Sequence, residues 1–445
     1  MKLFGTDGVR GTANRDLTPE LAVALGRAAA RVLVPHGGTV IIGRDTRESG
    51  PMLEGALAAG FAASGADVLL AGVIPTPAIS FLIKDEHAAL GAVISASHNP
   101  PADNGIKFFD SAGMKLPVAQ ERAIEDAFDH PPQGLRVGRI EPLEAAATRY
   151  AAFLTGTIES EEVDLSGTRI VVDCAYGATG EIAPRVLRHF NAEVIELHTA
   201  PDGSRINQEC GSTHLDPLRA AVLEHNADLG IAFDGDGDRV LLVGPDGKVI
   251  DGDRMMGIAA LHMQRAGAFT PPIVVATVMS NLGLERRLRD EGIELVRTPV
   301  GDRYVAWEMH SRGARLGGEQ SGHIIFSDHS PTGDGILTAV KLLEIAHLRR
   351  TSLPELAEEI PLFPQILRNV AVDDPTALAS HPTVTAAVSQ ESARLGDRGR
   401  ILVRPSGTQP LVRVMVEAIA PELCAEVADR LTAAIERAAQ SPANG

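Results

Sequence analysis

Residues 38–72 read GTVIIGRDTRESGPMLEGALAAGFAASGADVLLAG, and their pattern is repeated along the chain. The segment begins with a β-branched strand, continues through a polar loop and an amphipathic helix, and ends with a small turn and a second strand. This order is typical of a βαβ unit, in which the helix connects two parallel strands. The same plan recurs at residues 167–197 and 271–299. We therefore expect three α/β domains in series with mixed, largely parallel sheets.

The last part of the chain has a different order. A helix is expected from about Pro375 to Leu395, followed by two strands around a PSGTQP loop and a helix from about Pro421 to Ala439. This order indicates a smaller C-terminal α+β domain. One large doubly wound sheet is an alternative that the pattern leaves open. We place the domains at residues 1–154, 155–254, 255–364 and 365–445.

Composition narrows the class of protein. The chain has 445 residues, 44% hydrophobic and 22% charged, and a net charge of -17, which disfavours nucleic acids and anionic membranes as partners. Its three cysteines are far apart and form no Cys-x-x-Cys pair, which argues against a disulfide framework or a zinc site. No apolar run is long enough to span a bilayer, and the N-terminus lacks a signal-peptide pattern. We expect a cytoplasmic protein.

A serine follows one of the buried strands. Residues 94–109 read ISASHNPPADNGIKFF, in which Pro100 and Pro101 forbid continuation of the strand. Ser97 is therefore expected on a turn at the carboxyl end of a strand, and open α/β sheets bind their ligands at that edge. The alternative is an ordinary turn in which Ser97 and Asn99 bond the local backbone.

Three aspartates alternate with glycine between two apolar strands, in ADLGIAFDGDGDRVLLVG. An extended backbone would direct Asp234, Asp236 and Asp238 to one side. Two carboxylates at about 4 Å repel by roughly 4 kcal/mol at an effective dielectric constant of 20, so the cluster needs a cation. All-oxygen ligation favours Mg²⁺. An EF-hand is excluded, because Arg239 and Pro245 replace its glycine and glutamate. A solvated acidic hairpin remains the alternative.

Two further loops carry polar groups that could bind a ligand. In VRPSGTQPLVRVMVE, two arginines, two hydroxyls and a glycine suit the oxygens of a phosphate, although the same residues are common in turns. In LGGEQSGHIIF, Glu319, Ser321 and His323 offer hydroxyl-binding groups and a titratable imidazole, although a turn with a solvated glutamate is the alternative. No GxSxG elbow, Walker loop or dinucleotide fingerprint is present. The candidate phosphate-binding residues are Arg404, Ser406, Gly407, Thr408 and Arg413.

Five ordered motifs identify a family. FGTDGVRG, ISASHNPPADNGIKFF, FDGDGDR, GGEQSGH and RPSGTQPLVRVMVE, in this order and spacing, resemble the α-D-phosphohexomutase superfamily over essentially the whole chain. The resemblance implies four domains around a central cleft. It also implies an isomerase that interconverts a hexose 6-phosphate and 1-phosphate through a bound 1,6-bisphosphate. One departure is Gln409, where the phosphate loop of the family usually has glutamate.

The resemblance also implies roles for individual residues. Ser97, as a phosphoserine, would donate the phosphoryl group and complete a Mg²⁺ shell begun by Asp234, Asp236 and Asp238. Arg10 and Lys107 would neutralise charge and help with proton transfer, His323 would act as an acid or base, and Arg239 would orient groups near the metal loop. The residues expected to recognise the sugar are Gly301, Asp302, Arg303, Glu319 and Ser321. Those expected to bind the second phosphate are Arg404, Ser406, Gly407, Thr408 and Arg413.

The expected substrate depends on fewer residues. FGTDGVRG, VMSNLGLE, TPVGDRYV and Gln320 are similar to the aminosugar branch of the superfamily. We therefore expect interconversion of glucosamine 6-phosphate and glucosamine 1-phosphate, which would supply UDP-N-acetylglucosamine for bacterial cell-wall synthesis. The alternatives are the same chemistry on glucose or mannose phosphates, a serine-nucleophile metal phosphatase, and a sugar-phosphate sensor without the nucleophile. A monomer and a homodimer both remain open.

Overall fold

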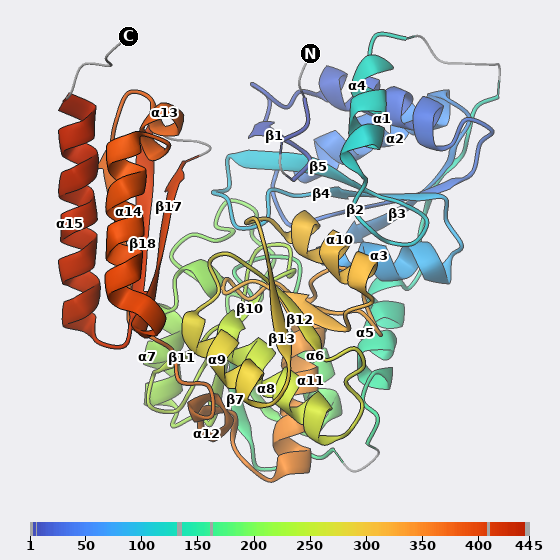
Figure 1. Ribbon diagram of the computed structural model, residues 1–445. Coiled ribbons are helices and arrows are strands. Elements are labelled where there is room, and N and C mark those ends of the chain that lie inside the picture. Colours follow the sequence, from blue (N-terminus) through green and yellow to red (C-terminus); the bar gives the residue numbers. More distant parts are fainter. Residues whose placement is uncertain (1–2, 6, 131–135, 161–162, 407–409, 441–445) are drawn as a thin grey trace. The chain divides into compact units, whose positions relative to one another are not determined.

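The computed structural model describes residues 3–5, 7–130, 136–160, 163–406 and 410–440. The chain divides into two compact units, of which the first contains residues 1–279 and 291–359 and the second contains residues 280–290 and 360–445. Each unit is described by itself below, with the elements labelled as in Figure 1.

The first sheet is mixed and has the strand order β1-β5-β4-β2-β3-β6. The pairs β2/β3, β2/β4 and β3/β6 are parallel, whereas β5 runs antiparallel to β4 and β1. Figure 1 shows α1, α2 and α4 on one side of this sheet and α3 on the other. The elements are β1 (Val9–Thr12), α1 (Pro19–Leu33), β2 (Thr39–Arg44), α2 (Gly50–Ala63), β3 (Asp67–Val73), α3 (Thr76–Asp85), β4 (Leu90–Ile94), β5 (Asp103–Phe109), α4 (Val118–Asp126), β6 (Ile140–Pro142) and α5 (Ala146–Gly156).

Small residues let α1 and α2 pack closely over this sheet. A Cβ atom at Gly60 would lie 2.3 Å from the carbonyl oxygen of Val23, and one at Gly26 would lie 2.6 Å from that of Leu57. Real Cβ atoms do not approach backbone oxygens so closely, so glycine is needed at both positions. The close contact helps to bury β2 and β4, whose carboxyl ends carry the loops discussed below.

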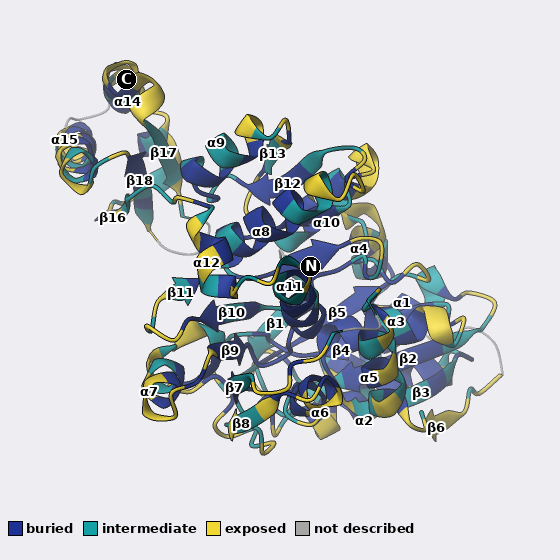
Figure 2. Ribbon diagram, turned by 90° about the horizontal axis from the view of Figure 1, so that it is seen from below, coloured by how far each residue is buried: buried dark blue, intermediate teal, exposed yellow. Residues whose placement is uncertain are grey.

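The second sheet has the order β11-β10-β9-β7-β8, with β7 parallel to β8 and β9, and with antiparallel pairs β9/β10 and β10/β11. Every residue of β9 and all but the first residue of β7 are buried, whereas the edge strand β8 has no buried residue. Figure 2 shows yellow, exposed residues on α7. The elements are β7 (Arg169–Asp173), α6 (Ile182–His189), β8 (Glu193–Leu197), η1 (Gly211–Thr213), α7 (Asp216–Glu224), β9 (Leu229–Phe233), β10 (Val240–Val243) and β11 (Val249–Ile250).

The third sheet has the order β13-β12-β14-β15, with β12 parallel to β13 and β14 and with β15 antiparallel to β14. Its elements in the first unit are α8 (Gly252–Arg265), β12 (Ile273–Thr277), β13 (Glu294–Thr298), α10 (Asp302–Arg312), β14 (Leu316–Gly318), β15 (Ile324–Phe326), α11 (Gly335–Arg349) and α12 (Leu353–Glu358).

The second unit is built on an antiparallel sheet with the order β16-β18-β17. Val412, Val414 and Val416 alternate along β18, and their buried side chains form a core with α14 and α15. Its elements are α9 (Leu282–Asp290), β16 (Gln365–Ala371), α13 (Pro375–Ala379), α14 (Pro382–Leu395), η2 (Gly396–Arg398), β17 (Gly399–Pro405), β18 (Leu411–Ala418) and α15 (Pro421–Gln440).

The expected fold class is confirmed, and the alternative of one large sheet is wrong because the strands form separate sheets. The helix expected from Pro375 to Leu395 is two helices, α13 and α14, which are interrupted before Pro382. Proline lacks the N–H that would continue α13, and it suits the first turn of α14. Each sheet lies within one expected domain, and we keep those boundaries as a proposal.

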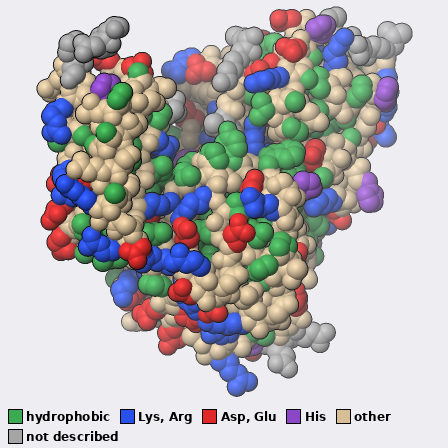
Figure 3. All heavy atoms as spheres, in the orientation of Figure 1, with side chains coloured by type: hydrophobic (Ala, Val, Ile, Leu, Met, Phe, Trp, Pro, Cys, Tyr) green, Lys and Arg blue, Asp and Glu red, His purple; other side chains and the backbone are tan. Residues whose placement is uncertain are grey.

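The surface carries both signs of charge. On the face shown in Figure 3, acidic and basic side chains are interspersed among apolar ones. In the described part of the chain, no helix combines the length and the apolar character that crossing a membrane requires.

A buried carboxyl group at the start of α11 predicts a pH dependence of stability. Asp334 caps this helix through the Leu337 N–H at 2.9 Å and accepts a hydrogen bond from the Tyr150 hydroxyl at 2.6 Å. Burial raises the pKa of Asp334 to about 6. The folded protein therefore binds this proton more tightly than the unfolded chain does, and the stabilisation that the proton provides is lost as the pH rises from about 4 to 6.

We expect Asp334→Asn to remove this dependence, because asparagine stays neutral and can still cap the helix. Relative to the wild type, the variant should gain about 2 kcal/mol in unfolding free energy between pH 4 and pH 6, measured by denaturant titration. Asp397→Asn, which changes an exposed aspartate, serves as the control. A difference between Asp334→Asn and wild type that does not vary with pH would contradict this assignment.

Candidate active site

Ser97 lies just beyond the carboxyl end of β4 and is 2% exposed. Its Oγ atom donates a hydrogen bond to Asp234 Oδ2 at 2.7 Å. Its backbone φ angle of 53° lies in the left-handed region, which non-glycine residues rarely adopt. The residue is therefore held in an unusual conformation with its hydroxyl directed at the aspartate loop, and a turn in which the Ser97 side chain bonds only the local backbone does not describe it.

The three aspartates lie in the loop between β9 and β10. One carboxylate oxygen from each of Asp234, Asp236 and Asp238 lies within 4.8 Å of the others. The loop is a turn with Gly237 at φ 70°, so the expected extended backbone is wrong, although the carboxylates still converge. All three residues are at most 3% exposed, which contradicts the alternative of a solvated acidic hairpin.

The electrostatics of this cluster suit a cation. Burial, together with the charges of Asp238 and Asp236, raises the pKa of Asp234 well above its usual range. Asp236 Oδ1 and Asp238 Oδ1 are buried oxygens without a hydrogen-bond partner among the residues that the structure describes. Buried, mutually repelling carboxylate oxygens of this kind are compensated by a hard divalent cation. The residues present therefore fit the expected metal ligands.

Lys107 is the cation closest to these carboxylates in the described chain. It projects from β5, is 2% exposed, and donates a hydrogen bond from Nζ to Asp236 Oδ2 at 3.1 Å. Asp7 Oδ2 lies 3.2 Å away and Asp238 Oδ2 lies 4.0 Å away. Burial lowers the pKa of Lys107, but the charges of Asp236 and Asp7 outweigh that effect and raise the pKa above its ordinary value. Lys107 is therefore charged at neutral pH.

Arg10 reaches the serine loop from β1. Its guanidinium forms an ion pair with Asp7 and donates to the carbonyl of Ala96 at 3.2 Å and to Asn99 Oδ1 at 3.4 Å. About a quarter of the side chain is exposed. Arg10 and Lys107 thus pair with the same oxygen of Asp7, and Arg10 also contacts the Ser97 loop, which fits the expected neutralisation of a phosphoryl group.

His323 and Arg239 lie next to the aspartates. His323 Nε2 accepts a hydrogen bond from the Gly333 N–H at 3.1 Å, and Nδ1 lies 3.7 Å from Asp238 Oδ1. The side chain is 2% exposed, so these contacts favour support of Asp238, and the acid/base role stays a prediction. Arg239 donates its backbone N–H to Asp234 at 3.2 Å, and its Nε lies 3.8 Å from Asp238 Oδ1.

The expected sugar loops meet each other, but two of their side chains have other partners. Glu319 is 8% exposed and accepts a hydrogen bond from the Gly301 N–H at 3.1 Å. Asp302 pairs with Lys115, and Arg303 forms a buried two-pronged ion pair with Glu121. The Asp302–Lys115 and Arg303–Glu121 ion pairs connect the part of the chain that contains the third sheet to the part that contains the first. The Arg303 guanidinium is therefore occupied by Glu121.

Two neighbouring residues of the same motif have separate environments. Ser321 Oγ is a buried atom with no hydrogen-bond partner within the described chain. Its expected role in sugar recognition stays a prediction. Gln320 donates to Asp251 Oδ2 at 3.5 Å, so its amide is turned toward the start of α8.

The expected phosphate loop belongs to the second unit. Arg404 on β17 and Arg413 on β18 are direct partners in the antiparallel ladder. Burial, followed by the charge of Arg413, lowers the pKa of Arg404. Two adjacent guanidinium groups repel each other, and a bound anion would relieve that repulsion. Ser406 closes the loop by donating its N–H to the Leu411 carbonyl at 2.9 Å, whereas Gly407 and Thr408 lie outside the described residues.

Sequence reasoning missed several residues that hold this site. Asp7 bridges Lys107 and Lys115, and those charges hold its pKa well below the usual range although burial opposes them. Asp45 and Arg47 lie in the loop after β2 and contact the Ser97 loop. The carboxyl-edge rule that located Ser97 could have located this pair, because β2 and β4 are parallel neighbours. No local signal marks Lys115.

Comparisons with known proteins agree with this geometry. Four family models match consecutive parts of the chain: phosphoglucomutase/phosphomannomutase alpha/beta/alpha domain I over residues 1–134, domain II over 148–247, domain III over 251–363, and the C-terminal domain over 367–434.

Relatives and solved structures cover nearly the whole chain. A phosphoglucosamine mutase of Carboxydothermus hydrogenoformans is 50% identical over 98% of this chain and 99% of its own. The crystal structure of a phosphoglucomutase/phosphomannomutase family protein from Burkholderia thailandensis has a TM-score of 0.82 and 26% identity, covering 98% of both chains. The Aspergillus fumigatus N-acetylphosphoglucosamine mutase, in complex with GlcNAc-6P and magnesium, shares the fold at 18% identity with a TM-score of 0.72, covering 99% of this chain and 96% of its own. The chain therefore belongs to the phosphoglucosamine mutase family, a group of isomerases among the phosphoglucomutase/phosphomannomutase proteins.

Proposed function

We propose that this protein interconverts glucosamine 6-phosphate and glucosamine 1-phosphate by phosphoryl transfer through Ser97. The observation that carries the proposal is the buried Ser97 hydroxyl, which donates to Asp234 within a cluster of three buried aspartates and beside Lys107. Membership of the phosphoglucosamine mutase family supports the choice of substrate.

In the forward reaction, a sugar hydroxyl attacks the phosphorus of phosphorylated Ser97. The bond between phosphorus and the sugar oxygen forms, the bond between phosphorus and Ser97 Oγ breaks, and the proton of the sugar hydroxyl passes to a base, for which His323 is the predicted residue. The resulting 1,6-bisphosphate reorients, and its other phosphoryl group returns to Ser97 while the product oxygen gains a proton. Lys107 and Arg10 stabilise the charge of the moving phosphoryl group. Lys107 pairs with Asp236 and Asp7, so its charge lies beside the aspartate cluster, and its expected help with proton transfer stays a prediction.

Asp234, Asp236, Asp238 and Ser97 would hold Mg²⁺, the ion present in the Aspergillus structure. When bound, this ion polarises phosphoryl oxygens and offsets negative charge. Magnesium suits the site because all of its donors are oxygens and the three carboxylates are buried with oxygens to spare.

Arg404 and Arg413 supply the second phosphate site that a mutase needs, because a bisphosphate carries a second group while the first one reacts. A metal phosphatase needs only the site at Ser97. The test is to incubate the protein with Mg²⁺, glucosamine 6-phosphate and a trace of glucose 1,6-bisphosphate, and to follow both isomers and free phosphate. Interconversion without phosphate release is expected, whereas release of phosphate without isomerisation would favour the phosphatase.

Substrate choice is expected to depend on Glu319. Its buried carboxylate is a counter-charge for the ammonium group of glucosamine phosphates, and glucose and mannose phosphates lack that cation. We expect wild-type kcat/KM to be highest for glucosamine 6-phosphate. Glu319→Gln should lower that preference over glucose 6-phosphate about tenfold, since one polar contact in a partly wet site has a modest effect.

Parallel kinetics with glucosamine, glucose and mannose 6-phosphates measure this preference. Glu308→Gln is the matched control, because Glu308 pairs with Arg312 on the surface of α10. Equal or higher wild-type kcat/KM for glucose or mannose 6-phosphate would assign the protein to those sugars instead.

A further inference from the structure

The backbone of Ser97 is held on both sides. Its N–H donates to Ser95 Oγ at 2.8 Å, and its carbonyl oxygen accepts from Arg47 Nη2 at 3.1 Å and from Asn207 Nδ2 at 2.8 Å. The left-handed φ of Ser97 is unfavourable for a residue with a Cβ atom, so it persists only where the surroundings impose it. The hydrogen bonds to the Ser97 N–H and carbonyl groups therefore maintain this left-handed conformation.

Arg47 is the centre of this network. Its side chain is fully buried, and all five of its N–H groups have acceptors. Nε donates to the Asp45 carboxylate at 2.9 Å, and the rest of the guanidinium donates to four backbone carbonyls of one loop. Those carbonyls belong to Ser97, Asn99, Pro100 and Asp103. One side chain therefore fixes the whole turn that carries Ser97 to the end of β2.

Asp45 fixes the N–H side of Ser97 through Ser95. Besides pairing with Arg47, it accepts the Ser95 hydroxyl at 2.6 Å, and Ser95 in turn accepts the Ser97 N–H. The ion pair thus controls both the N–H and the carbonyl of Ser97. Since both charged groups are fully buried and compensate each other, neither can be removed without leaving an unpaired charge.

Asn207 provides a second anchor, from the loop after β8. Its amide also donates to the Asn99 carbonyl at 3.2 Å. Asp173 fixes this loop, because it accepts the Gly211 N–H and the Ala175 N–H, each at 2.9 Å. Ala175 accepts the Asn207 N–H at 3.0 Å.

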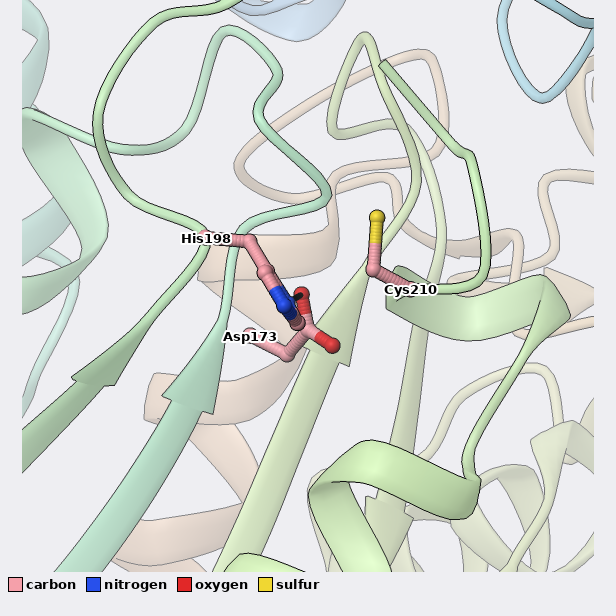
Figure 4. Close-up of side chains that lie close together, drawn as sticks. All are labelled: Asp173, His198 and Cys210. Carbon is pink, nitrogen blue, oxygen red and sulfur yellow. Dashed lines mark ion pairs between the residues drawn. The ribbon is translucent and has the colours of Figure 1, made fainter. Parts of the chain in front are cut away.

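Asp173 also lies beside His198, with Cys210 nearby. Figure 4 shows the Asp173 carboxylate beside the His198 imidazole, and one ligand atom from each of Asp173, His198 and Cys210 lies within 4.8 Å of the others. Burial raises the pKa of Cys210 to about 12, so the thiol is protonated at neutral pH. These contacts assign Asp173 to loop anchoring.

We propose that Arg47, supported by Asp45 and Asn207, is a positioning residue that sets Ser97 Oγ at the aspartate cluster for phosphoryl transfer. The inference builds on the proposed function. Lysine cannot replace this arginine, because one ammonium group lacks the planar fork that reaches four carbonyls and a carboxylate together. Misplacement of the reacting oxygen slows transfer and leaves the groups that bind the sugar phosphate in place.

The test compares Arg47→Lys, Asn207→Ala and the double variant with wild type. Arg44→Lys is the control, since Arg44 pairs with Glu54 at the same end of β2. The protein is first phosphorylated on Ser97 with radiolabelled glucose 1,6-bisphosphate, and transfer of the label from Ser97 to glucosamine 6-phosphate is followed in a single turnover by rapid quench. Steady-state kcat and KM and thermal unfolding are measured in parallel.

We expect the transfer rate and kcat of Arg47→Lys to fall about 100-fold and those of Asn207→Ala about tenfold, with KM changed less than about threefold. In the double variant, Asn207→Ala should add less than tenfold, because both residues hold the same carbonyl. The proposal would be overturned if Asn207→Ala transferred the phosphoryl group at the wild-type rate. It would also be overturned if the loss of transfer rate in Arg47→Lys equalled its unfolded fraction or the loss in Arg44→Lys. If Arg47→Lys does not fold, the transfer rate of Asn207→Ala alone tests the proposal. Failure of the wild type to isomerise would instead refute the proposed function.

Discussion

Ser97→Ala is expected to abolish isomerisation, with kcat falling at least about 10⁴-fold, while the protein remains folded. The hydroxyl is the group that carries the phosphoryl, and no neighbouring side chain can replace a lost nucleophile. Stability should change little, because the mutation removes one hydrogen bond to Asp234 and keeps the Cβ atom. Intact-mass analysis should detect a phosphorylated population in the wild type and none in the variant.

Ser80→Ala is the matched control for this experiment. Ser80 is also fully buried in the first sheet region, where its hydroxyl donates to the Gly113 carbonyl at 2.7 Å. We expect this variant to lose about 1 kcal/mol of stability and to keep its turnover. Wild-type activity in Ser97→Ala would remove Ser97 from the mechanism.

Asp236→Asn is expected to lower activity about 100- to 1,000-fold and to weaken Mg²⁺ binding. Asp236 contributes one of the three converging carboxylates, and its Oδ2 atom accepts from Lys107 Nζ at 3.1 Å and from Thr76 Oγ1 at 2.7 Å. Removing its charge relieves repulsion from Asp234 and Asp238 but deprives Lys107 of a partner. The two effects oppose each other, so the stability of the metal-free protein should change less than its activity.

A thermal-shift titration separates metal binding from turnover. Mg²⁺ at about 100 times its Kd should stabilise the wild type by roughly 2.7 kcal/mol, and the same concentration should stabilise Asp236→Asn much less. EDTA should inhibit the wild type, and added Mg²⁺ should restore activity. Asp246→Asn, in the exposed turn before β11, is the control. An undiminished Mg²⁺ shift in Asp236→Asn would contradict the metal assignment.

Much of the fold could be predicted because its signals are local. The alternation of strand, loop and helix at residues 38–72, 167–197 and 271–299 predicted three parallel pairs, and β2/β3, β7/β8 and β12/β13 confirm them. The same local reading misjudged the backbone of residues 234–239. Alternating glycines permit both an extended strand and a tight turn, so the pattern alone could not distinguish them.

The partners of individual site residues could not be predicted in the same way. Lys115 and Asp302 are 187 positions apart, and Arg303 and Glu121 are 182 positions apart. Such pairs depend on how separate sheets pack, which no spacing in the chain reports. Arg303 illustrates the consequence, because its motif suggested a sugar ligand and the structure commits its guanidinium to Glu121.

The sequence by itself determined which chemical groups are present and which strand end each one follows, because strand periodicity and turn residues act over a few positions. Ser97 and the three aspartates were located in this way. Only the tertiary structure decided that these groups are buried together, that Lys107 is held charged between Asp7 and Asp236, and that Arg47 fixes the Ser97 turn. Burial and long-range pairing set the charge and the position of a group, and both arise only when segments distant in the chain pack against one another.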